Sequence, residues 1–307
     1  MTGYLRVSSP WSQLGIFLGL FGGAYIISSI LAGVFLLMQG VPIQNVDSID
    51  WTRPGMVTTM KWIQAVSSIM IFLLPALLYA WITFKNRSFY FLGLKKPEKT
   101  AMYGLGVLCI MLAFPFVIWL GVLNHQIPLP EWMTALERDT AKQMEALLKV
   151  NKPVDILVNI IIVALLPAIC EELCFRGALQ RILIQCTKSP WAGIIIASVL
   201  FSALHMQFQG FLPRMFLGVL LGALYWYSGS LWTSILAHFV YNGVQVVAVS
   251  FAPEYVTENP SIPVWAGLSS GVIVVILLWL YAKLSTITYP TVYNTDHLNT
   301  PNQHFTS

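Results

Sequence analysis

Residues 154–175 read VDILVNIIIVALLPAICEELCF, an apolar run that ends beside two adjacent glutamates. Such a run is long enough to cross the roughly 30 Å hydrocarbon core of a bilayer as a helix. Pro167 lies one turn before Glu171 and is expected to kink the helix there, because proline cannot donate a hydrogen bond to the carbonyl of Val163. The segment therefore predicts a membrane-spanning helix that carries charged side chains.

The rest of the chain has the same apolar character. Hydrophobic residues make up 57% of the 307 residues and charged residues only 10%, against roughly 25% charged residues in an ordinary globular protein. So few charges cannot cover so much apolar surface in water, and lipid is expected to surround most of the chain. The net charge of +4 is scattered and forms no basic stripe. Composition thus excludes a soluble enzyme, a disordered protein and a nucleic-acid-binding protein.

Apolar segments recur along the whole sequence, and we expect an all-α, polytopic membrane protein with about eight transmembrane helices. The expected spans are 14–38, 62–84, 101–123, 154–175, 190–208, 212–228, 232–250 and 264–284. They fall into an N-terminal three-helix region (1–124), an amphipathic connecting segment (125–153), a set of core helices (154–250), a last transmembrane helix (251–284) and a polar tail that is predicted to be disordered (285–307).

Basic residues set the expected orientation. The strongest positive cluster lies between the second and third spans and consists of Lys85, Arg87, Lys95, Lys96 and Lys99. Positively charged loops stay in the cytoplasm, so both termini are expected to be cytoplasmic. The sequence predicts a multi-pass protein of the cell membrane, with a bacterial inner membrane as the expected location and the lipid bilayer as a partner.

Charged side chains inside a span are costly and indicate a functional site. On a helix, Glu172 and Arg176 are four residues apart and share a face, so we expect an ion pair between them. Glu171 is rotated by about 100° from Glu172 and points elsewhere. The first carboxylate is therefore expected to be available for chemistry, while the second is neutralised by the guanidinium.

Two later spans add imidazoles and a carboxamide. His205 follows Phe201 on the fifth span, and His238 lies four residues before Asn242 on the seventh. If these side chains converge with Glu171, they can activate water and stabilise an oxyanion. Read separately, a buried histidine or asparagine more often makes a structural hydrogen bond between helices. Zinc binding is an alternative, although no HExxH motif is present and Asn242 would be a poor zinc ligand, so a site without a metal or cofactor is favoured.

Three motifs stand in order on successive helices: EExxxR (171–176), FxxxH (201–205) and HxxxN (238–242). Over about residues 150–250 this pattern resembles the CAAX protease and bacteriocin-processing family, abbreviated CPBP or Abi. The resemblance implies an eight-helix intramembrane endopeptidase that acts on a peptide or membrane-protein substrate by a glutamate-dependent mechanism without a catalytic metal.

The resemblance also implies a role for each motif residue. Glu171 would be the general base and would work with His205 on a water molecule, and His238 and Asn242 would hold the oxyanion. Glu172 and Arg176 would be supporting residues that stabilise the helix and its electrostatics.

Two alternatives remain beside this hypothesis: a zinc-dependent version of the protease, and a non-enzymatic bacteriocin-immunity or scaffold protein of the same fold. A transporter would need ionisable residues along a path across the membrane and halves that resemble each other, and the sequence has neither. One geometric difficulty concerns His205, which lies about 22 Å along a helix that starts near residue 190. The fifth helix would have to start late, tilt or break for His205 to reach Glu171.

Overall fold

The computed structural model describes residues 9–41, 49–51, 53, 55–84, 88–256 and 260–293. Within these ranges every regular element is a helix, and seven continuous helical segments are long and apolar enough to cross a membrane. These segments are Pro10–Met38, Met56–Thr83, Ala101–His125, Pro153–Thr187, Phe208–Ser228, Leu231–Phe251 and Val264–Lys283. The predicted all-α polytopic architecture is confirmed, and the chain is a multi-pass membrane protein.

The helices have the following bounds: α1 (Pro10–Met38), α2 (Met56–Ser67), α3 (Leu74–Phe84), α4 (Ser88–Phe91), α5 (Ala101–His125), α6 (Glu131–Leu148), α7 (Pro153–Asn159), α8 (Leu166–Glu172), α9 (Arg181–Thr187), α10 (Pro190–Ala203), α11 (Phe211–Ser228), α12 (Leu231–Phe251), α13 (Val264–Lys283) and α14 (Tyr289–Tyr293). Wider π-helical turns over Ser68–Leu73, Ile160–Leu165 and Leu173–Gln180 join α2 to α3, α7 to α8 and α8 to α9. Short 3₁₀ turns occupy Phe208–Gly210 and Pro253–Val256.

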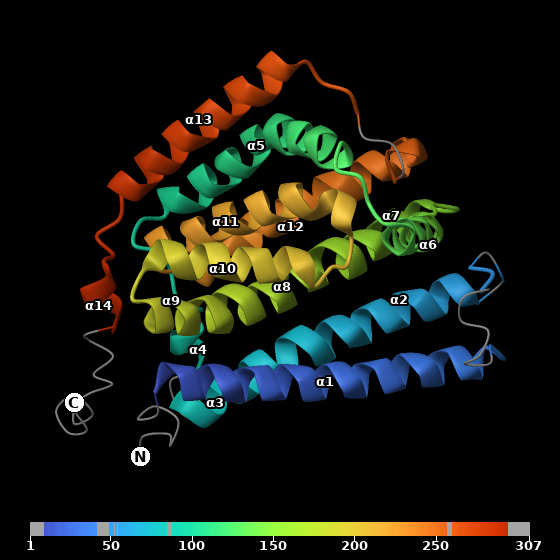
Figure 1. Ribbon diagram of the computed structural model, residues 1–307, viewed down its shortest axis with the longest axis horizontal. Coiled ribbons are helices and arrows are strands. Elements are labelled where there is room, and N and C mark those ends of the chain that lie inside the picture. Colours follow the sequence, from blue (N-terminus) through green and yellow to red (C-terminus); the bar gives the residue numbers. More distant parts are fainter. Residues whose placement is uncertain are drawn as a thin grey trace.

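The helices form three layers (Figure 1). One outer layer holds α1, α2 and α3, and the opposite outer layer holds α5 and α13. The run from α7 to α9, together with α10, α11 and α12, lies between them. A buried apolar cluster joins α1 and α3 to α9 and α10, and a second cluster joins α5 to α11 and α13. The polar motif residues therefore belong to the central layer, where other helices rather than lipid surround them.

The fourth predicted span is longer than expected. The sequence predicted its end at residue 175, but the helix continues to Thr187 and covers 35 residues. A polar side chain in this extension bonds to a neighbouring helix: Gln180 Nε2 donates to the carbonyl of Gly222 at 3.1 Å. The prediction was wrong because a polar stretch that packs against neighbouring helices need not mark the membrane boundary.

The fifth predicted span is shorter than expected. It was placed at 190–208, whereas α10 ends at Ala203 after 14 residues, a length of about 21 Å. Met206 adopts a left-handed backbone with φ of 54°, which redirects the chain toward α11. The fifth predicted span is therefore present as a helix but falls short of the length that crosses the hydrocarbon core by itself.

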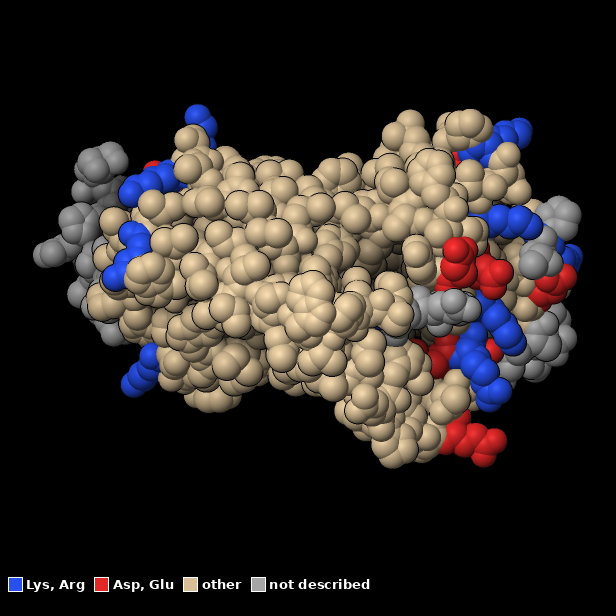
Figure 2. Space-filling model, turned by 90° about the horizontal axis from the view of Figure 1, so that it is seen from above, with Lys and Arg blue, Asp and Glu red and all other residues tan. Residues whose placement is uncertain are grey.

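Charges gather at the two ends of the molecule, and the middle is almost free of them (Figure 2). α1 begins and α14 ends at the same end of the molecule as α4 and the α9–α10 turn (Figure 1). This arrangement puts Lys95, Lys96 and Lys99 at that end, as the predicted topology requires. The remaining members of the basic cluster, Lys85 and Arg87, lie outside the described residues. The cytoplasmic location of this end stays a prediction.

The polar tail departs from its predicted disorder. Residues 285–293 fold back on the core, and α14 packs against the α11 end of the central layer. The ring of Tyr293 stacks on Trp226 with centroids 6.4 Å apart, and its hydroxyl donates to the carbonyl of Arg181 at 3.1 Å. Aromatic packing thus outweighs the polar composition here, while residues 294–307 lie outside the described residues.

Candidate active site

The two glutamates end α8 and are enclosed by the central layer. Glu171 is 7% exposed and Glu172 is fully buried. The π-helical turns that begin at Leu173 widen the helix directly after them, a distortion that is common at functional sites. The expected ion pair is present: Arg176 Nη1 lies 2.8 Å from Glu172 Oε1. The guanidinium also donates from Nη2 to the carbonyl of Gly218 at 3.2 Å.

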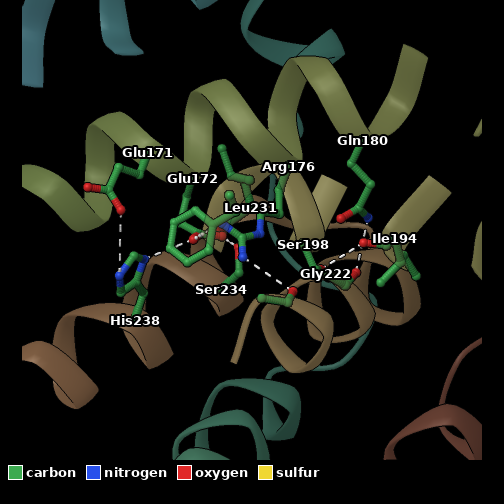
Figure 3. Close-up of polar contacts among 12 residues, drawn as sticks. Glu171, Glu172, Arg176, Gln180, Ile194, Ser198, Gly222, Leu231, Ser234 and His238 are labelled. Carbon is green, nitrogen blue, oxygen red and sulfur yellow. Dashed lines mark hydrogen bonds and ion pairs between the residues drawn. The ribbon is translucent and has the colours of Figure 1, made fainter. Parts of the chain in front are cut away.

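His238 on α12 lies between the two carboxylates (Figure 3). Its Nδ1 is 2.9 Å from Glu172 Oε1, and its Nε2 is 3.9 Å from Glu171 Oε2. An ionised carboxylate only accepts hydrogen bonds, so Nδ1 carries the proton that is shared with Glu172. Nε2 is then the nitrogen left to face Glu171. The gap between Glu171 and His238 is too long for a direct hydrogen bond and short enough for one water to bridge.

His205 reaches the depth of Glu171 because α9 and α10 form a long antiparallel hairpin. Lys188, with φ of 55°, turns the chain, and Glu171 and His205 lie 17 residues on either side of it. The register of the hairpin is shown by Phe175 and Phe201, each 13 residues from Lys188, whose rings meet edge to face at 5.1 Å. The geometric difficulty disappears because the fourth helix extends to Thr187 instead of ending at residue 175.

The imidazole of His205 is held just beyond α10 rather than on it. Its Nδ1 lies 2.8 Å from the carbonyl of Phe201, which fixes the proton on Nδ1 because a carbonyl only accepts. The ring of Phe201 lies between the two imidazoles, 4.9 Å from His205 and 6.1 Å from His238. The guanidinium of Arg176 lies 4.6 Å from the same ring. The ring of Phe201 thus contacts both imidazoles and the guanidinium of Arg176.

Asn242 lies one turn after His238 on α12 and is partly exposed. Among the described residues, no hydrogen bond joins its side chain to the other motif residues. The structure therefore brings Glu171, Glu172, Arg176 and His238 into one connected cluster, places His205 at the same level, and leaves Asn242 near the cluster without a bond to it.

The linker between α10 and α11 carries His205 and is tied down along its length. Asn124 on α5 donates from Nδ2 to the carbonyl of Phe208 at 2.9 Å and accepts from the amide of Leu212 at 2.7 Å. The hydroxyl of Ser202 donates to the carbonyl of Phe211 at 2.8 Å. From α6, Glu137 Oε1 accepts from the amide of Gln209 at 3.0 Å. These contacts hold the position of His205.

Sequence reasoning missed the linker contacts and one charged residue, Arg214. Arg214 lies inside the predicted span 212–228, so the rule that marks intramembrane charges as functional would have identified it. Asn124 had no such signal, because an asparagine at the end of an apolar run resembles an ordinary helix terminus.

The described side chains form no preassembled metal centre. A catalytic zinc takes three protein ligands, whereas the described residues contain no group of three His, Cys, Asp or Glu side chains arranged to hold a metal ion. Glu171 and His238 supply two potential ligands, and Nε2 of His205 stays free while its Nδ1 is bonded to the carbonyl of Phe201.

Comparisons with known proteins point to the same segment. Residues 153–244 match the model of a family described as type II CAAX prenyl endopeptidase Rce1-like. The uncharacterized protein YpbD of Bacillus subtilis (strain 168) is 32% identical over 97 residues, which cover 30% of this chain and 47% of that protein. The match thus spans about half the length of this curated relative, and no solved structure matches the chain. The segment that carries every motif residue is therefore similar to the Rce1-like CAAX prenyl endopeptidases, which confirms the family resemblance seen in the sequence.

Proposed function

We propose that the protein is an intramembrane endopeptidase that hydrolyses a peptide bond in a membrane-associated peptide or protein substrate. The observation that carries the proposal is the approach of Glu171 Oε2 and His238 Nε2 to 3.9 Å, inside a buried polar cluster of an otherwise apolar helix bundle. Buried ionisable groups that lie this close together are costly, and a hydrolytic site is a function that requires them. The family similarity of residues 153–244 supports a protease.

In the proposed reaction Glu171 is the general base. It takes a proton from a water molecule while the water oxygen adds to the carbonyl carbon of the substrate, and His205 helps to hold that water through its free Nε2. The carbonyl oxygen becomes an oxyanion, which Asn242 stabilises by donating from its side-chain amide and His238 stabilises by donating from Nε2 in the doubly protonated form of the ring. Collapse of the intermediate breaks the carbon–nitrogen bond, and the proton held by Glu171 passes to the leaving amine.

The neighbouring residues suit these roles. The attacking oxygen and the oxyanion are bonded to the same carbon, so the base and the oxyanion donor must be neighbours, as Glu171 and His238 are. Glu172 receives the Nδ1 proton of His238 and so turns Nε2 toward the substrate. Arg176 balances the charge of Glu172 at 2.8 Å. Glu172 and Arg176 thus act through His238 rather than on the substrate.

The test compares protein termini in membranes of cells that express the wild type or Glu171→Gln, a substitution that keeps the shape of the side chain and removes the base. Glu145→Gln, an exposed change on α6, is the matched control. New peptide ends are expected with the wild type and Glu145→Gln and not with Glu171→Gln. Identical termini in all three samples, with Glu171→Gln folded, would overturn the proposal and favour a non-enzymatic immunity or scaffold protein.

A chelator added to the same assay tests the mechanism. We propose a glutamate-dependent reaction without a metal cofactor, so cleavage is expected to continue at the same rate after chelation. Loss of the new termini with chelator and their return with added zinc would instead establish the metal-dependent version.

A further inference from the structure

Arg214 is a second cation of the central layer that the proposed reaction does not use. It lies near the start of α11, in a segment apolar enough to span a membrane, and it is partly buried. Charged side chains at such positions almost always face a protein interior or a cavity and pair with another group. The groups around Arg214 therefore indicate which kind of ligand it can bind.

The guanidinium is fixed in place by neutral groups. Nη1 donates to the side-chain oxygen of Gln207, and Nη2 donates to the backbone carbonyl of Gln207 at 2.5 Å. Gly210 packs closely against the guanidinium. A Cβ at that position would lie 2.6 Å from Nη2 and 3.0 Å from Cζ. Any larger residue at position 210 would displace the guanidinium. The cation is thus held in one orientation before any ligand arrives.

No carboxylate lies within ion-pair distance of Arg214 in the part of the chain that the structure describes. Arg176 has its ion pair with Glu172 at 2.8 Å, whereas Arg214 makes none, and its buried Nε has no hydrogen-bond partner. Glu137 and Glu171 are close enough to interact with it electrostatically. However, Glu137 Oε1 is bonded to the amide of Gln209 instead. A cation that is desolvated without a partner is unfavourable unless a ligand supplies the counter-charge.

Arg214 also borders the proposed reaction centre. It interacts electrostatically with Glu171 on α8, with His205 on the linker and with Tyr241, the residue before Asn242 on α12. These neighbours belong to α8, the linker and α12, which also supply the motif residues, so a group bound to Arg214 would lie near the proposed reaction centre. Glu171 itself is committed to the water and to His238 in the proposed reaction, and it does not act as the permanent partner of Arg214.

We propose that Arg214, backed by Gln207 and Gly210, forms an anion-binding subsite that receives a carboxylate of the peptide substrate. The inference rests on the proposed function and adds a substrate preference to it. An unmodified peptide carries negative charge only on acidic side chains and on its C-terminal carboxylate, and both present the planar pair of oxygens that a guanidinium binds best.

The experiment uses the full chain in nanodiscs of zwitterionic phosphatidylcholine, which excludes anionic lipid as a competing ligand. The probes are four sets of randomised apolar decapeptides: with a C-terminal carboxylate or amide, and with or without Asp and Glu. Cleavage is followed by mass spectrometry for the wild type, Arg214→Gln, Arg214→Lys and the exposed control Arg138→Gln. Thermal melting of each variant verifies folding, and Arg214→Lys keeps the charge if Arg214→Gln does not fold.

The wild type and Arg138→Gln are expected to cleave carboxylate-bearing sets about tenfold faster or more, the effect of one charge-assisted hydrogen bond. Arg214→Gln is expected to lose this preference, and Arg214→Lys to keep part of it because a point charge remains. Selectivity for the C-terminal carboxylate or for the acidic side chains identifies the source of the anion. Equal cleavage of all four sets by the wild type, or an equal loss of rate on all four sets in Arg214→Gln, would overturn the proposal.

Binding of the same peptides to Glu171→Gln protein separates this proposal from the proposed function. If the wild type cuts none of the peptides but Glu171→Gln protein still binds the carboxylate-bearing sets through Arg214, the anion-binding subsite stands. The proposed protease function is then overturned. Equal binding of acid and amide peptides would overturn the subsite even where the wild type cleaves.

Discussion

His238 Nδ1 lies 2.9 Å from Glu172 Oε1, so the orientation of an imidazole on α12 is set by a carboxylate on α8. The same oxygen lies 2.8 Å from Arg176 Nη1, and all three side chains are buried. One carboxylate oxygen therefore joins two helices and neutralises a buried cation.

Glu172→Gln tests this double role. Removal of one partner of a buried ion pair costs about 3–5 kcal/mol, because the other charge is left without compensation. We expect a loss of that order in the free energy of unfolding, measured by denaturant titration in detergent, together with loss of cleavage. Glu145→Gln, which is exposed, should change stability by less than about 0.5 kcal/mol.

Adding Arg176→Met to Glu172→Gln should restore part of the stability, since no unpaired charge then remains. Cleavage should stay absent in the double variant because the neutral amide oxygen accepts more weakly from Nδ1 and no longer stabilises a positive charge on His238. A double variant less stable than Glu172→Gln alone would contradict this account of the pair.

Asn124→Ala is expected to loosen the linker that carries His205. The substitution removes the acceptor of the Leu212 amide and the donor to the Phe208 carbonyl, at a cost of about 1–3 kcal/mol. Hydrogen exchange should accelerate at the amide of Leu212, and the rate of cleavage should fall.

Two further variants test whether the side chain of Asn124 holds the linker. Asn124→Asp keeps the acceptor for Leu212 and should protect its amide more than Asn124→Ala does. Thr134→Ala, which removes an exposed hydroxyl on α6, is the control. Unchanged exchange at Leu212 in Asn124→Ala would show that Asn124 does not hold the linker.

Gly193→Ala is expected to part the hairpin of α9 and α10. A Cβ there would lie 2.7 Å from the backbone nitrogen and 2.9 Å from the Cα of Ile184, and backbone atoms cannot move aside cheaply. Overpacking of this kind costs about 1–3 kcal/mol. The substitution should also reduce the rate of cleavage, because the same hairpin places Glu171 and His205 at the same depth.

Gly104→Ala on α5 is the matched control for Gly193→Ala. A Cβ at Gly104 would meet nothing within 4 Å, so the variant should be neutral or gain about 0.5–1 kcal/mol from helix propensity. Equal melting temperatures for the two alanine variants would contradict the close approach of α9 and α10.

Tyr293 is predicted to attach the C-terminal segment to the core. Tyr293→Phe loses the hydrogen bond to the Arg181 carbonyl and should cost about 1 kcal/mol. Tyr293→Ala also loses the stacking on Trp226 and should cost about 3 kcal/mol. Thermal melting measures both losses, and limited proteolysis should cut near residue 285 in Tyr293→Ala first. Equal melting of both variants and the wild type would show that α14 does not contribute to stability.

Much of this architecture could be predicted from the sequence because lipid imposes a simple rule on helix length and polarity. The rule identified the spans, and helical spacing alone paired Glu172 with Arg176. It failed where protein rather than lipid surrounds the chain. The extension to Thr187 is polar and buried, and α14 is held by aromatic contacts that only the folded chain creates.

The site could be predicted only in part. The residue types of the motifs indicated the chemistry, but helical spacing could not show that His238, rather than His205, lies next to Glu171. That neighbour depends on the packing of α8 against α12, which no local pattern encodes. Arg214 and Gln207 meet only because the linker folds back on the start of α11.

The 35-residue helix that carries Glu171 has a consequence for any substrate. Glu171 lies near its middle, about 27 Å from one end and about 24 Å from the other at 1.5 Å per residue. A transmembrane segment that arrives there as a helix has its carbonyls already bonded to its own amides. To offer one carbonyl to the bound water it must unwind locally, and the stretch of chain that unwinds most easily, at a glycine or proline, is where the cut is expected to fall.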